Sequence, residues 1–499
     1  MEMAGNKATA EQRTEHFDVL IVGAGISGID AAYHLQTDCP EKSFVMLDTQ
    51  ESFGGTWNTH KYPGIRSDSD LFTFGYKWKP WSGAPIATAD KILAYLKESI
   101  EEQDLAKHIR YSHKVETASW SEEDQLWTFT VLKTDSGELL QFTCSFLWMC
   151  QGYYRHSEGY TPEFPGKENF KGEIIHPQTW PEDLDYTDKK VVVIGSGATA
   201  ATIIPAMADK AGHVTMLQRS PTYFFPAPNR NELADTLREL EVPEEWTHEI
   251  TRRKVLFDQK IVARRSFEEP EKLREELLGA ARQYLGEDFD IEKHFTPSYR
   301  PWRQRLAFVP NGDLFTAIRE KKASVVTDHI EEFTENGIRL KSGEVLEADI
   351  IITATGFNLS VLGDIEFTIN GEALDFSETW GHRGIMFSGI PNMAWVFGYL
   401  RTSWTMRANL VSDFVCKLLN HMKEKGVKSV TPQLRAEDKD MPKLDFVDAE
   451  NFNAGYLMRN MHLMPKQGNK QPWVFSQDYY TEKDEIANTD FEDGTLQYK

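Results

Sequence analysis

A run of branched apolar residues followed by a glycine-rich turn opens the first recognisable unit of the chain. Residues 17–22 have the composition of a buried strand, and a turn with three glycines occupies 23–28. Residues 29–37 are typical of a helix, and 43–48 form a second apolar run. Strand, glycine turn, helix and strand are the beginning of a parallel βαβ unit.

The same order of elements returns about 170 residues later. Residues 190–194 are mostly apolar, the turn 195–200 contains two glycines, and a helical stretch extends to about residue 209. A further apolar run follows at 213–218. This repetition predicts two dinucleotide-binding folds in one chain.

The remaining patterns predict how the two units are completed. Residues 229–295, rich in Glu, Arg, Leu and Lys with helical spacing, predict a helical insert with a charged, solvated surface. Apolar residues at 411, 414, 415, 418 and 419 mark a core-facing helix that Gly426 can end. No role is assigned to the polar tail after residue 428. Further strands are expected at 128–131, 139–142, 145–149, 324–327, 337–340 and 348–354.

Composition and charge narrow the classes of protein. The 499 residues include 55 basic and 77 acidic side chains, a formal net charge of -22, which disfavours binding to nucleic-acid phosphates or to an anionic membrane surface. The amino-terminal segment lacks the apolar core of a signal peptide and no run approaches 18 apolar residues, so a cytoplasmic protein without a membrane span is expected. The four cysteines have no CxxC spacing, and no metal site is predicted.

The first glycine turn has the residues that bind a dinucleotide with free ribose hydroxyls. Gly23 permits the tight turn, Gly25 lets the backbone approach a pyrophosphate, and Gly28 allows helix and strand to touch. Asp48 lies 20 residues beyond Gly28, at the end of the second strand, where a carboxylate can accept both ribose hydroxyls. A glycine turn without a ligand is the alternative.

The second turn differs in two ways. Ala200 replaces the third glycine, and Gln218, Arg219 and Ser220 stand where a carboxylate would end the second strand. An arginine and a hydroxyl can bind a 2′-phosphate that an acid would repel, so NADPH is favoured over NADH, with a surface arginine as the alternative. One site for an adenine dinucleotide and another for NADPH indicate a flavin enzyme reduced by NADPH.

Two large classes of flavin enzyme share this plan. Disulfide reductases need a redox cysteine pair beside the flavin, whereas Cys144 and Cys150 lie late in the first unit and six residues apart. Monooxygenases need no redox group of the protein, because reduced flavin reacts with oxygen itself. Two longer strings separate the classes: residues 54–68 are GGTWNTHKYPGIRSD, and residues 170–181 are FKGEIIHPQTWP.

Both strings resemble the two fingerprints of type I Baeyer-Villiger monooxygenases, which are class B flavin-dependent monooxygenases, and match them at every specified position. Related enzymes that oxidise nitrogen or sulfur typically carry Tyr or Phe where Trp180 and Pro181 stand. The resemblance extends over about residues 17–425. It is closest to the ethionamide-activating monooxygenase branch, through RQRLAFVPNGDLF at 303–315 and IITATGFN at 351–358.

The resemblance implies an α/β protein with two nested Rossmann-type dinucleotide-binding domains and a helical insert. Residues 1–155 would form the first part of the FAD-binding domain. Residues 156–325 would form the NADPH-binding domain, with its insert at about 226–297. Residues 326–499 would form the second part of the FAD-binding domain and the carboxy-terminal tail.

The resemblance also implies which residues bind the two cofactors. Two positions depart from the family, since Asp48 replaces the more frequent Glu and Asn58 stands where a close relative has Asp. The residues expected around FAD are Gly23, Gly25, Ser27, Gly28, Asp48, Gly55, Thr56, Trp57, Asn58, Thr59, Asp68 and, through its backbone at the adenine, Val115. The residues expected around NADPH are Arg66, Ser67, Asp68, Gly195, Ser196, Gly197, Ala198, Thr199, Ala200, Ala201, Arg219 and Ser220.

The implied chemistry is an oxygen insertion. Arg305 occupies the place of the family's active-site arginine and Asp68 that of the carboxylate that orients it, with Arg303 as the alternative. NADPH and oxygen would serve to insert one oxygen atom beside a ketone carbonyl through a C4a-peroxyflavin, giving an ester or lactone, with sulfide oxidation as a side activity. The alternatives are a flavin monooxygenase acting mainly on sulfur or nitrogen, an uncoupled NADPH oxidase, and a non-catalytic flavin-binding redox sensor.

Four further side chains have a structural interpretation. His176 is expected to hold the two domains in register through hydrogen bonds. Trp57 and Tyr62 are expected to pack around the flavin. Trp404 is expected either to wall the substrate pocket or to lie in the core.

Overall fold

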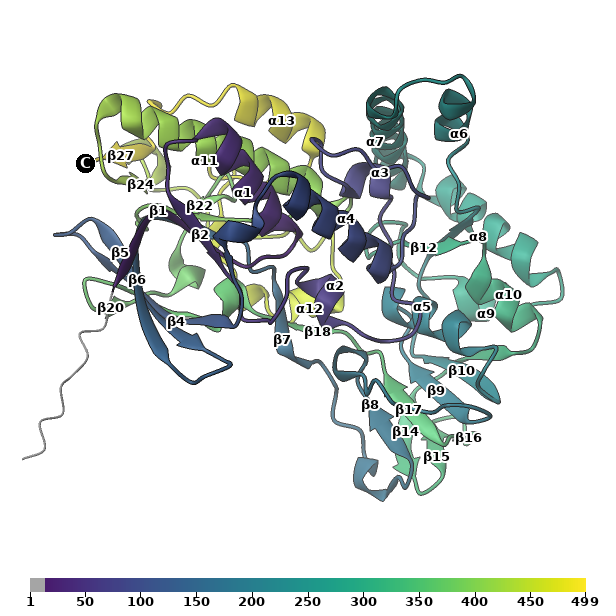
Figure 1. Cartoon of the computed structure of the whole chain (residues 1–499). Coiled ribbons are helices and arrows are strands. Elements are labelled where there is room, and N and C mark those ends of the chain that lie inside the picture. Colours follow the sequence, from purple (N-terminus) through teal and green to yellow (C-terminus); the bar gives the residue numbers. More distant parts are fainter. Residues whose placement is uncertain (1–13) are drawn as a thin grey trace, which may run out of the picture.

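The first glycine turn leads out of a sheet that is buried on both sides. The computed structural model of the protein describes residues 14–499, and its first sheet is built around β1 (Glu15–Val22) (Figure 1). Val19 and Ile21 of β1 face one apolar cluster, whereas Leu20 and Val22 face another on the opposite side. A strand covered on both faces is apolar throughout, which is the pattern seen in the sequence.

Parallel and antiparallel strands share this sheet. β2 (Phe44–Leu47) and β6 (Leu139–Met149) lie parallel to β1 on its two sides. The expected strands 139–142 and 145–149 are one continuous strand, because the alternating polar residues between them face one side of the sheet. The other members are β3 (Ile109–Arg110), β4 (His113–Ser121), β5 (Leu126–Lys133), β19 (Glu366–Ile369), β20 (Glu372–Ala373) and β23 (Met393–Trp395).

Helices from both ends of the chain cover one face of the first sheet. α1 (Ile26–Asp38) packs against α11 (Trp404–Lys425), with α4 (Ala89–Glu102) beside them. Gly426 ends α11 in the left-handed conformation at φ 66°, as the sequence predicted. The predicted core-facing helix is therefore confirmed.

The second glycine turn leads out of a separate parallel sheet. Its strand order is β13 (Ala323–Thr327), β10 (His213–Gln218), β9 (Lys190–Ile194), β17 (Ile350–Thr353) and β8 (Glu173–Ile175). α5 (Ala198–Met207) and α10 (Asp313–Arg319) cover one face. A small sheet covers the other, formed by β14 (Ile330–Thr334), β15 (Gly337–Leu340) and β16 (Val345–Glu347).

This pairing corrects one expected boundary. The family resemblance implies that the chain returns to the first domain at residue 326, but β17 pairs in parallel with β9 through Ile350–Val191 and Ile352–Val193. Residues 330–353 therefore belong to the second sheet and its covering layer. The two nested Rossmann-type units of an α/β protein are otherwise as predicted, and the fold class is confirmed.

Two strands link the lobe built around the first sheet to the lobe built around the second sheet. A helical insert of the second lobe packs against the first lobe. β7 (Tyr154–Gly159) and β18 (Phe357–Leu359) run antiparallel between the lobes in Figure 1. The insert lies between β11 (Phe224–Ala227) and β12 (Ala307–Pro310), which pair with each other. Its helices are α6 (Glu232–Glu239), α7 (Glu244–Glu268), α8 (Pro270–Leu285) and α9 (Ile291–Phe295), as the sequence predicted.

One buried arginine fastens the insert to the first lobe. Arg252 of α7 donates from Nη1 to the carbonyl oxygens of Phe72, Thr73 and Gly75 at 2.9–3.2 Å. Those carbonyls end α3 (Leu71–Phe74), which follows the string 54–68. α2 (Thr56–Thr59) lies within that string. The insert thus steadies the segment that carries Asp68.

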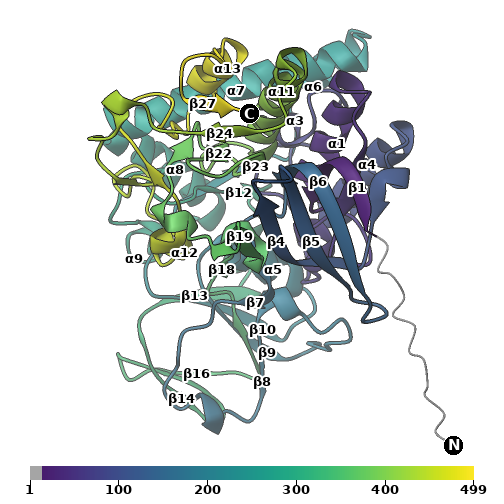
Figure 2. The same ribbon diagram turned by 90° about the vertical axis from the view of Figure 1, so that its left-hand side faces the viewer.

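The tail after residue 428, to which the sequence pattern assigns no role, is folded against the first lobe. Figure 2 shows the carboxy-terminus beside α11. Phe446, Phe475 and Met464 of the tail join the apolar cluster on the second face of the first sheet. The elements of residues 381–498 besides β23 and α11 are β21 (Gly381–His382), β22 (Met386–Phe387), β24 (Val430–Pro432), β25 (Leu444–Asp445), α12 (Gly455–Met458), β26 (Lys466–Gln467), α13 (Tyr479–Ala487) and β27 (Leu496–Tyr498).

A buried ion pair fixes this tail and carries a stability prediction. Glu482 accepts from Arg407 Nε at 3.1 Å and from Tyr399 Oη at 2.5 Å, with side-chain exposures of 5% and 0% for the acid and the arginine. Glu482→Ala strands a buried guanidinium, so we expect a loss of about 3–5 kcal/mol in the free energy of unfolding, measured by urea denaturation. Glu347→Ala, which removes the surface partner of Lys190, is the control and should change the midpoint little. Equal shifts of the urea midpoint in Glu482→Ala and Glu347→Ala would show that the buried ion pair does not stabilise the fold more than a surface pair.

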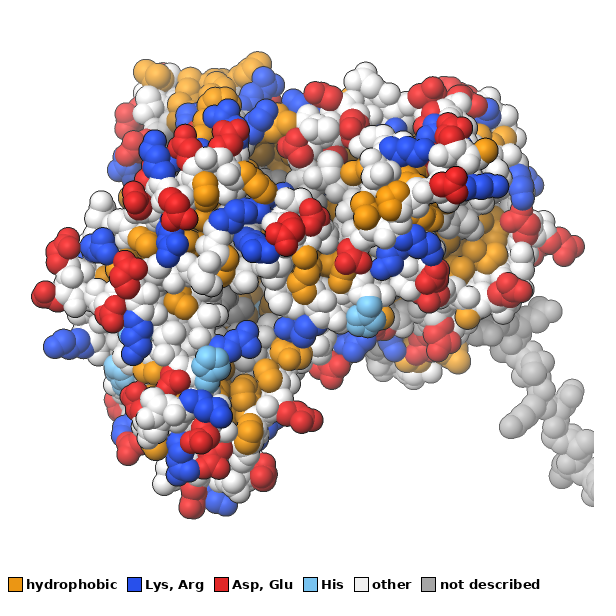
Figure 3. Space-filling model, turned by 180° about the vertical axis from the view of Figure 1, so that it is seen from behind, with side chains coloured by type: hydrophobic (Ala, Val, Ile, Leu, Met, Phe, Trp, Pro, Cys, Tyr) orange, Lys and Arg blue, Asp and Glu red, His pale blue; other side chains and the backbone are white. Residues whose placement is uncertain are grey.

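The surface and the cysteines add little to the picture of function. On the face seen in Figure 3, basic and acidic side chains are interspersed. No helix within residues 14–499 has the length and apolar character needed to cross a membrane. The same residues contain no cluster of His, Cys, Asp or Glu suited to a metal ion, and all four cysteines are free and buried.

Candidate active site

A cavity of about 890 Å³ lies where the two glycine turns meet. It is bordered by Gly23 and Gly25 at the carboxyl end of β1, and by Gly195 and Gly197 at the carboxyl end of β9. Ligands of open α/β sheets bind beyond the carboxyl ends of the strands. The cavity therefore has the place expected for two dinucleotides.

The three glycines of the first turn have different structural reasons. Gly23 has φ 103°, and a Cβ there would lie 2.7 Å from the Cys150 carbonyl oxygen. A Cβ on Gly28 would lie 1.9 Å from the Gly23 carbonyl oxygen, so helix and strand touch at this position. At Gly25 the nearest atom to a Cβ would be Gly55 Cα at 3.7 Å, which is an ordinary contact. Space at Gly25 is thus left for a ligand rather than filled by the protein.

The second turn repeats this division. Gly195 has φ 138° and would place a Cβ 2.3 Å from the Ala354 carbonyl oxygen, whereas a Cβ on Gly197 would meet nothing within 4 Å. Ala200, at the third position, is fully buried in the apolar cluster under the turn. A methyl group there packs, so the missing glycine does not disturb the turn.

Polar atoms in the cavity lack protein partners. The amide atoms Nε2 and Oε1 of Gln151 and the ring atom Nδ1 of His60 are buried and make no hydrogen bond to a described residue. Burial, with His156 and His176 nearby, lowers the pKa of His60 to about 4, so its ring is neutral at neutral pH. Buried polar groups of this kind are normally paired. Together with the open space at Gly25 and Gly197, they fit a site built to hold bound dinucleotides.

The predicted cofactor residues divide into those that reach the cavity and those that do not. Asn58 and Thr59 turn toward Gln50, which they contact at 2.7 Å each. Of the predicted residues, the cavity is lined by Gly23, Gly25, Ser27, Asp48, Gly55, Thr56, Trp57, Arg66, Ser67, Asp68, Val115, Gly195, Ser196, Gly197, Ala198, Thr199 and Arg305. Those that do not line it are Gly28, Asn58, Thr59, Ala200, Ala201, Arg219 and Ser220.

Asp48 is held by the backbone at the end of β2. Its Oδ2 accepts from the Ala24 amide at 2.7 Å and its Oδ1 from the Gln50 amide at 2.8 Å. Burial raises the pKa of Asp48, and the two backbone hydrogen bonds, which act to lower it, do not outweigh that effect. The carboxylate is thereby fixed beside the first glycine turn, where it also borders the cavity.

Arg305 and Asp68 form a two-pronged ion pair at the cavity wall. Arg305 Nε donates to Asp68 Oδ2 at 2.6 Å, and Nη2 donates to Oδ1 at 2.7 Å. Burial acts to raise the pKa of Asp68, but the facing guanidinium outweighs it and lowers that pKa. Arg305 lines the cavity with 33% of its side chain exposed, so it is a fixed cation beside the ligand space.

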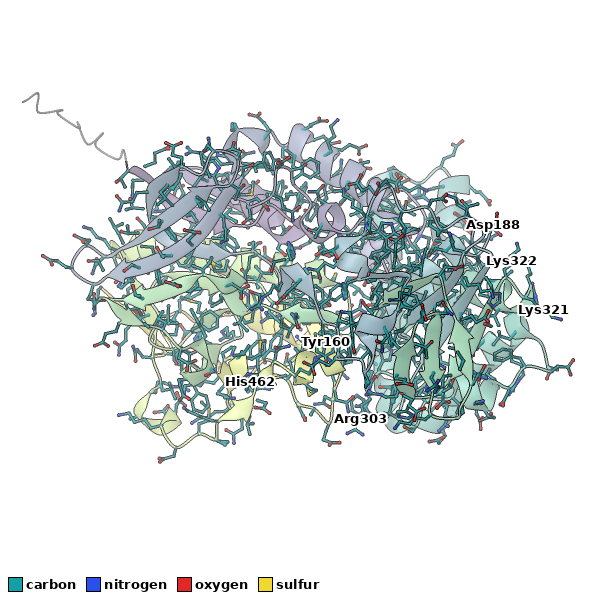
Figure 4. All side chains as sticks on the ribbon, turned by 90° about the horizontal axis from the view of Figure 1, so that it is seen from below. Tyr160, Asp188, Arg303, Lys321, Lys322 and His462 are labelled. Carbon is teal, nitrogen blue, oxygen red and sulfur yellow. The ribbon has the colours of Figure 1, made fainter. Side chains whose placement is uncertain are left out.

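Arg303 has a different environment. Figure 4 shows it at the edge of the molecule, and its Nη2 lies 3.1 Å from Glu450 Oε2. It does not line the cavity. Of the two arginines, Arg305 is the one placed to act on a ligand.

Residues near the second turn are arranged around the same cavity. Arg66 forms a two-pronged ion pair with Asp313 of α10, and Ser67 Oγ donates to the Ser69 carbonyl at 2.7 Å. Ser196 Oγ donates to the Ser220 carbonyl oxygen at 3.3 Å, which brings residue 220 beside the turn. Arg219 follows β10 at the exposed surface and has no ion-pair partner in the described chain.

The histidine and the aromatic residues have clear positions. His176 Nε2 lies 3.1 Å from the Gly356 carbonyl oxygen and its Nδ1 accepts from the Gln178 amide, so it bridges the segments that join the lobes. Trp57 packs against Phe74 on the first lobe. Tyr62 borders the cavity as well, but it packs on the apolar cluster of the second lobe rather than that of the first.

Several cavity residues had no recognisable signal in the sequence. Tyr153, Tyr154 and Tyr456 line the cavity, the last from α12 in the tail. Trp404 also lines it and stacks on Tyr153 with ring centroids 5.1 Å apart. Only the tertiary fold brings the three tyrosines together, so no local motif could have revealed them. For Trp404, the position at the cavity wall is one of the two that were expected from the sequence.

Known proteins resemble this chain over nearly its whole length. The profile of the flavin-binding monooxygenase-like family matches residues 85–230, and that of an NAD(P)-binding Rossmann-like domain matches residues 21–79. The FAD-containing monooxygenase EthA of Mycolicibacterium smegmatis is 50% identical over 469 residues, or 94% of this chain and 94% of that protein. The chain belongs to the family of FAD-containing monooxygenases that includes EthA.

Further relatives of this monooxygenase agree. EthA of Mycobacterium tuberculosis is 49% identical over 93% of this chain and 94% of its own length, and the probable FAD-binding monooxygenase AlmA of Acinetobacter baylyi is 42% identical over 97% and 96%. A solved structure of an oxidized steroid monooxygenase bound to NADP superposes with a TM-score of 0.77 at 21% identity, covering 97% of this chain and 99% of that one. The open crystal structure of cyclohexanone monooxygenase gives 0.73 at 19% identity, covering 97% and 100%.

The relatives decide between the two classes of flavin enzyme that share the double-turn plan. The monooxygenase is a flavin-dependent enzyme, as the two fingerprint strings predicted, and the predicted family is confirmed. The solved structures share its fold.

Proposed function

We propose that this monooxygenase inserts one oxygen atom beside a ketone carbonyl and releases an ester or a lactone, using FAD, NADPH and molecular oxygen. The observation that carries the proposal is the ion pair of Arg305 and Asp68 at the wall of a cavity bordered by two glycine turns. The strings 54–68 and 170–181 support it, because they match both Baeyer-Villiger fingerprints. Because its four cysteines are free, we further propose that the enzyme works in a reducing cytoplasm.

The residues present fit both cofactors. Gly25, Ser27 and Asp48 would hold FAD at the first turn, and Gly197 and Thr199 would hold NADPH at the second. When bound, the reduced flavin supplies the electrons that activate molecular oxygen.

Arg305 is built to stabilise negative charge on the substrate. A guanidinium has five N–H donors. Within the described chain, Arg305 places four of these on both Asp68 oxygens, on Ser69 Oγ at 3.2 Å and on the Leu400 carbonyl at 3.2 Å. One Nη1 hydrogen remains for a ligand. As the ketone carbon is attacked, its oxygen gains negative charge, and a fixed cation in a site with little water stabilises that charge by a few kcal/mol, roughly.

Asp68 keeps that cation in place. Its two oxygens accept from Nε and Nη2, so the plane of the guanidinium is set. Two parallel hydrogen bonds between a carboxylate and an arginine fix orientation as well as charge. Asp68 therefore acts through Arg305 and does not need to touch the substrate.

Oxygenation at sulfur is the second candidate. The flavin-binding monooxygenase-like profile covers residues 85–230, and an attack on a thioether needs neither a carbonyl nor a cation beside one. Product analysis on matched ketones and sulfides distinguishes the two. We expect ketones to yield esters, with sulfoxides as lesser products, and sulfoxides alone would overturn the proposal in favour of sulfur oxidation.

Consumption of NADPH separates an oxygen-inserting enzyme from a redox sensor and from an uncoupled oxidase. A redox sensor would not oxidise NADPH catalytically under air, and an uncoupled oxidase would release hydrogen peroxide in step with NADPH whether or not a ketone is present. We expect a ketone to divert most of that NADPH into product. If no ketone lowers the release of hydrogen peroxide, the protein is an uncoupled oxidase and not an oxygen-inserting enzyme.

The nucleotide preference tests the second turn. A charge-assisted contact to a 2′-phosphate is worth about 1.5–3 kcal/mol, so Arg219→Ala should raise the KM for NADPH roughly 10- to 100-fold and that for NADH little. Arg230→Ala removes an exposed arginine of the same lobe and serves as the control. If steady-state kinetics show the same change for both nucleotides, Arg219 does not read the phosphate.

A further inference from the structure

Three tyrosine hydroxyls meet in the cavity and have no part in the function described so far. Tyr153 Oη and Tyr154 Oη are 2.7 Å apart at the start of β7. Tyr456, from α12 in the tail, packs against both rings, with centroids 6.3 Å from Tyr153 and 6.0 Å from Tyr154. All three side chains line the cavity that Arg305 also borders.

The cluster is held rigidly. Tyr153 stacks on Trp404 with an interplanar angle of 9°, and Trp404 Nε1 donates to Ser27 Oγ at 2.8 Å. The ring of Tyr154 packs on Phe357, with centroids 4.5 Å apart. The hydroxyls are therefore fixed with respect to α1 at the first glycine turn and to the strands that join the lobes.

The cluster is also protonated and lies within the field of Arg305. Burial raises the pKa of each of the three phenols above its usual range, so each keeps its proton at neutral pH. The charges of Arg305 and Asp68 act on Tyr154 and Tyr456. These two hydroxyls thus share the ligand space with the ion pair.

Counting protons shows which hydroxyl is free to donate. A tyrosine hydroxyl donates one hydrogen bond and can accept two. The contact between Tyr153 and Tyr154 uses one hydroxyl proton, whichever of the two donates, so the proton of Tyr456 is left for a ligand.

We propose that Tyr456 is a further catalytic residue, which donates a hydrogen bond to the ketone oxygen while Tyr153 and Tyr154 position it. The free Nη1 hydrogen of Arg305, which lines the same cavity, would contact the same oxygen. This inference rests on the proposed function, because only a carbonyl substrate offers an oxygen that gains charge during the attack. A thioether has no such atom, so Tyr456 should matter for ketones and not for sulfides.

The test compares one variant on two substrates. Tyr456→Phe keeps the ring and removes the hydroxyl, and we expect ester formation from a ketone to fall about 10²–10³-fold, as for the loss of one donor to a developing oxyanion. Sulfoxide formation and the anaerobic reduction of the flavin by NADPH should stay near the wild-type rates. Tyr160→Phe is the matched control, since the Arg459 guanidinium lies 3.6 Å from the centre of the Tyr160 ring and Tyr160 does not line the cavity.

A second variant keeps the inference open to refutation if Tyr456→Phe loses its flavin. Tyr154→Phe removes the hydroxyl from the ring that packs on Tyr456, so we expect a smaller loss that is again confined to ketones. An equal loss on ketone and sulfide, or no loss on either in both variants, overturns the role. Failure of the proposed function is seen separately, as a wild-type enzyme that forms no ester from any ketone.

Discussion

Arg305→Ala should abolish most ester formation while leaving the flavin reducible. The residue forms no part of the two glycine turns, and one hydrogen of its Nη1 has no partner among residues 14–499 at the wall of the cavity. Losing one such donor typically costs about 10²–10³ in rate, because the interaction is stronger in the transition state than in the ground state. Anaerobic bleaching of the flavin by NADPH and ester yield under air measure the two steps.

Two neighbouring variants make the Arg305 result specific. Arg303→Ala removes an arginine that pairs with Glu450 outside the cavity and should keep most of the activity. Asp68→Ala should form ester at a rate between those of Arg305→Ala and Arg303→Ala, because a mispositioned guanidinium keeps its charge. Should Arg305→Ala form ester near the wild-type rate while Arg303→Ala does not, the two roles are exchanged. If both variants stay active, the arginine has no role in the reaction.

Gly25→Val should yield a folded but colourless protein. A Cβ at this position meets only Gly55, whose Cα lies 3.7 Å away, so the backbone accepts it, whereas a pyrophosphate that touches the glycine does not. We expect the flavin absorbance per chain to drop from roughly one FAD to nearly none, with circular dichroism near that of the wild type.

The second turn supplies the matched control for this variant. Gly197 is equally free of neighbours, so Gly197→Val should retain the yellow FAD and lose affinity for NADPH. A soluble Gly25→Val protein with full flavin content would show that FAD is bound elsewhere. Loss of FAD from both variants would show that the two turns are not separate sites.

The glycine turns and the strands around them could be predicted because their signals are local. Residues 17–28 and 190–200 determine strand, turn and helix through contacts within one βαβ unit. The helix ended by Gly426 and the helical insert were likewise predicted from spacing alone. Sheet membership is not local, which is why residues 330–353 were assigned to the wrong lobe.

The active site shows the same limit. Arg305 and Asp68 are 237 residues apart, and only the resemblance to a family placed them together before the structure did. Tyr456 had no such help, since it lies in a tail whose composition is polar and irregular. Its position depends on apolar contacts of the tail, through Phe446 and Phe475, with the second face of the first sheet.

Isotope analysis of the product tests the central claim most directly. The enzyme is incubated with NADPH, a simple cyclic ketone and ¹⁸O₂, and the product is examined by gas chromatography and mass spectrometry. The proposed function predicts a lactone that carries one ¹⁸O atom in its ring. Recovery of the unchanged ketone while NADPH is consumed, or a lactone without the label, would contradict it.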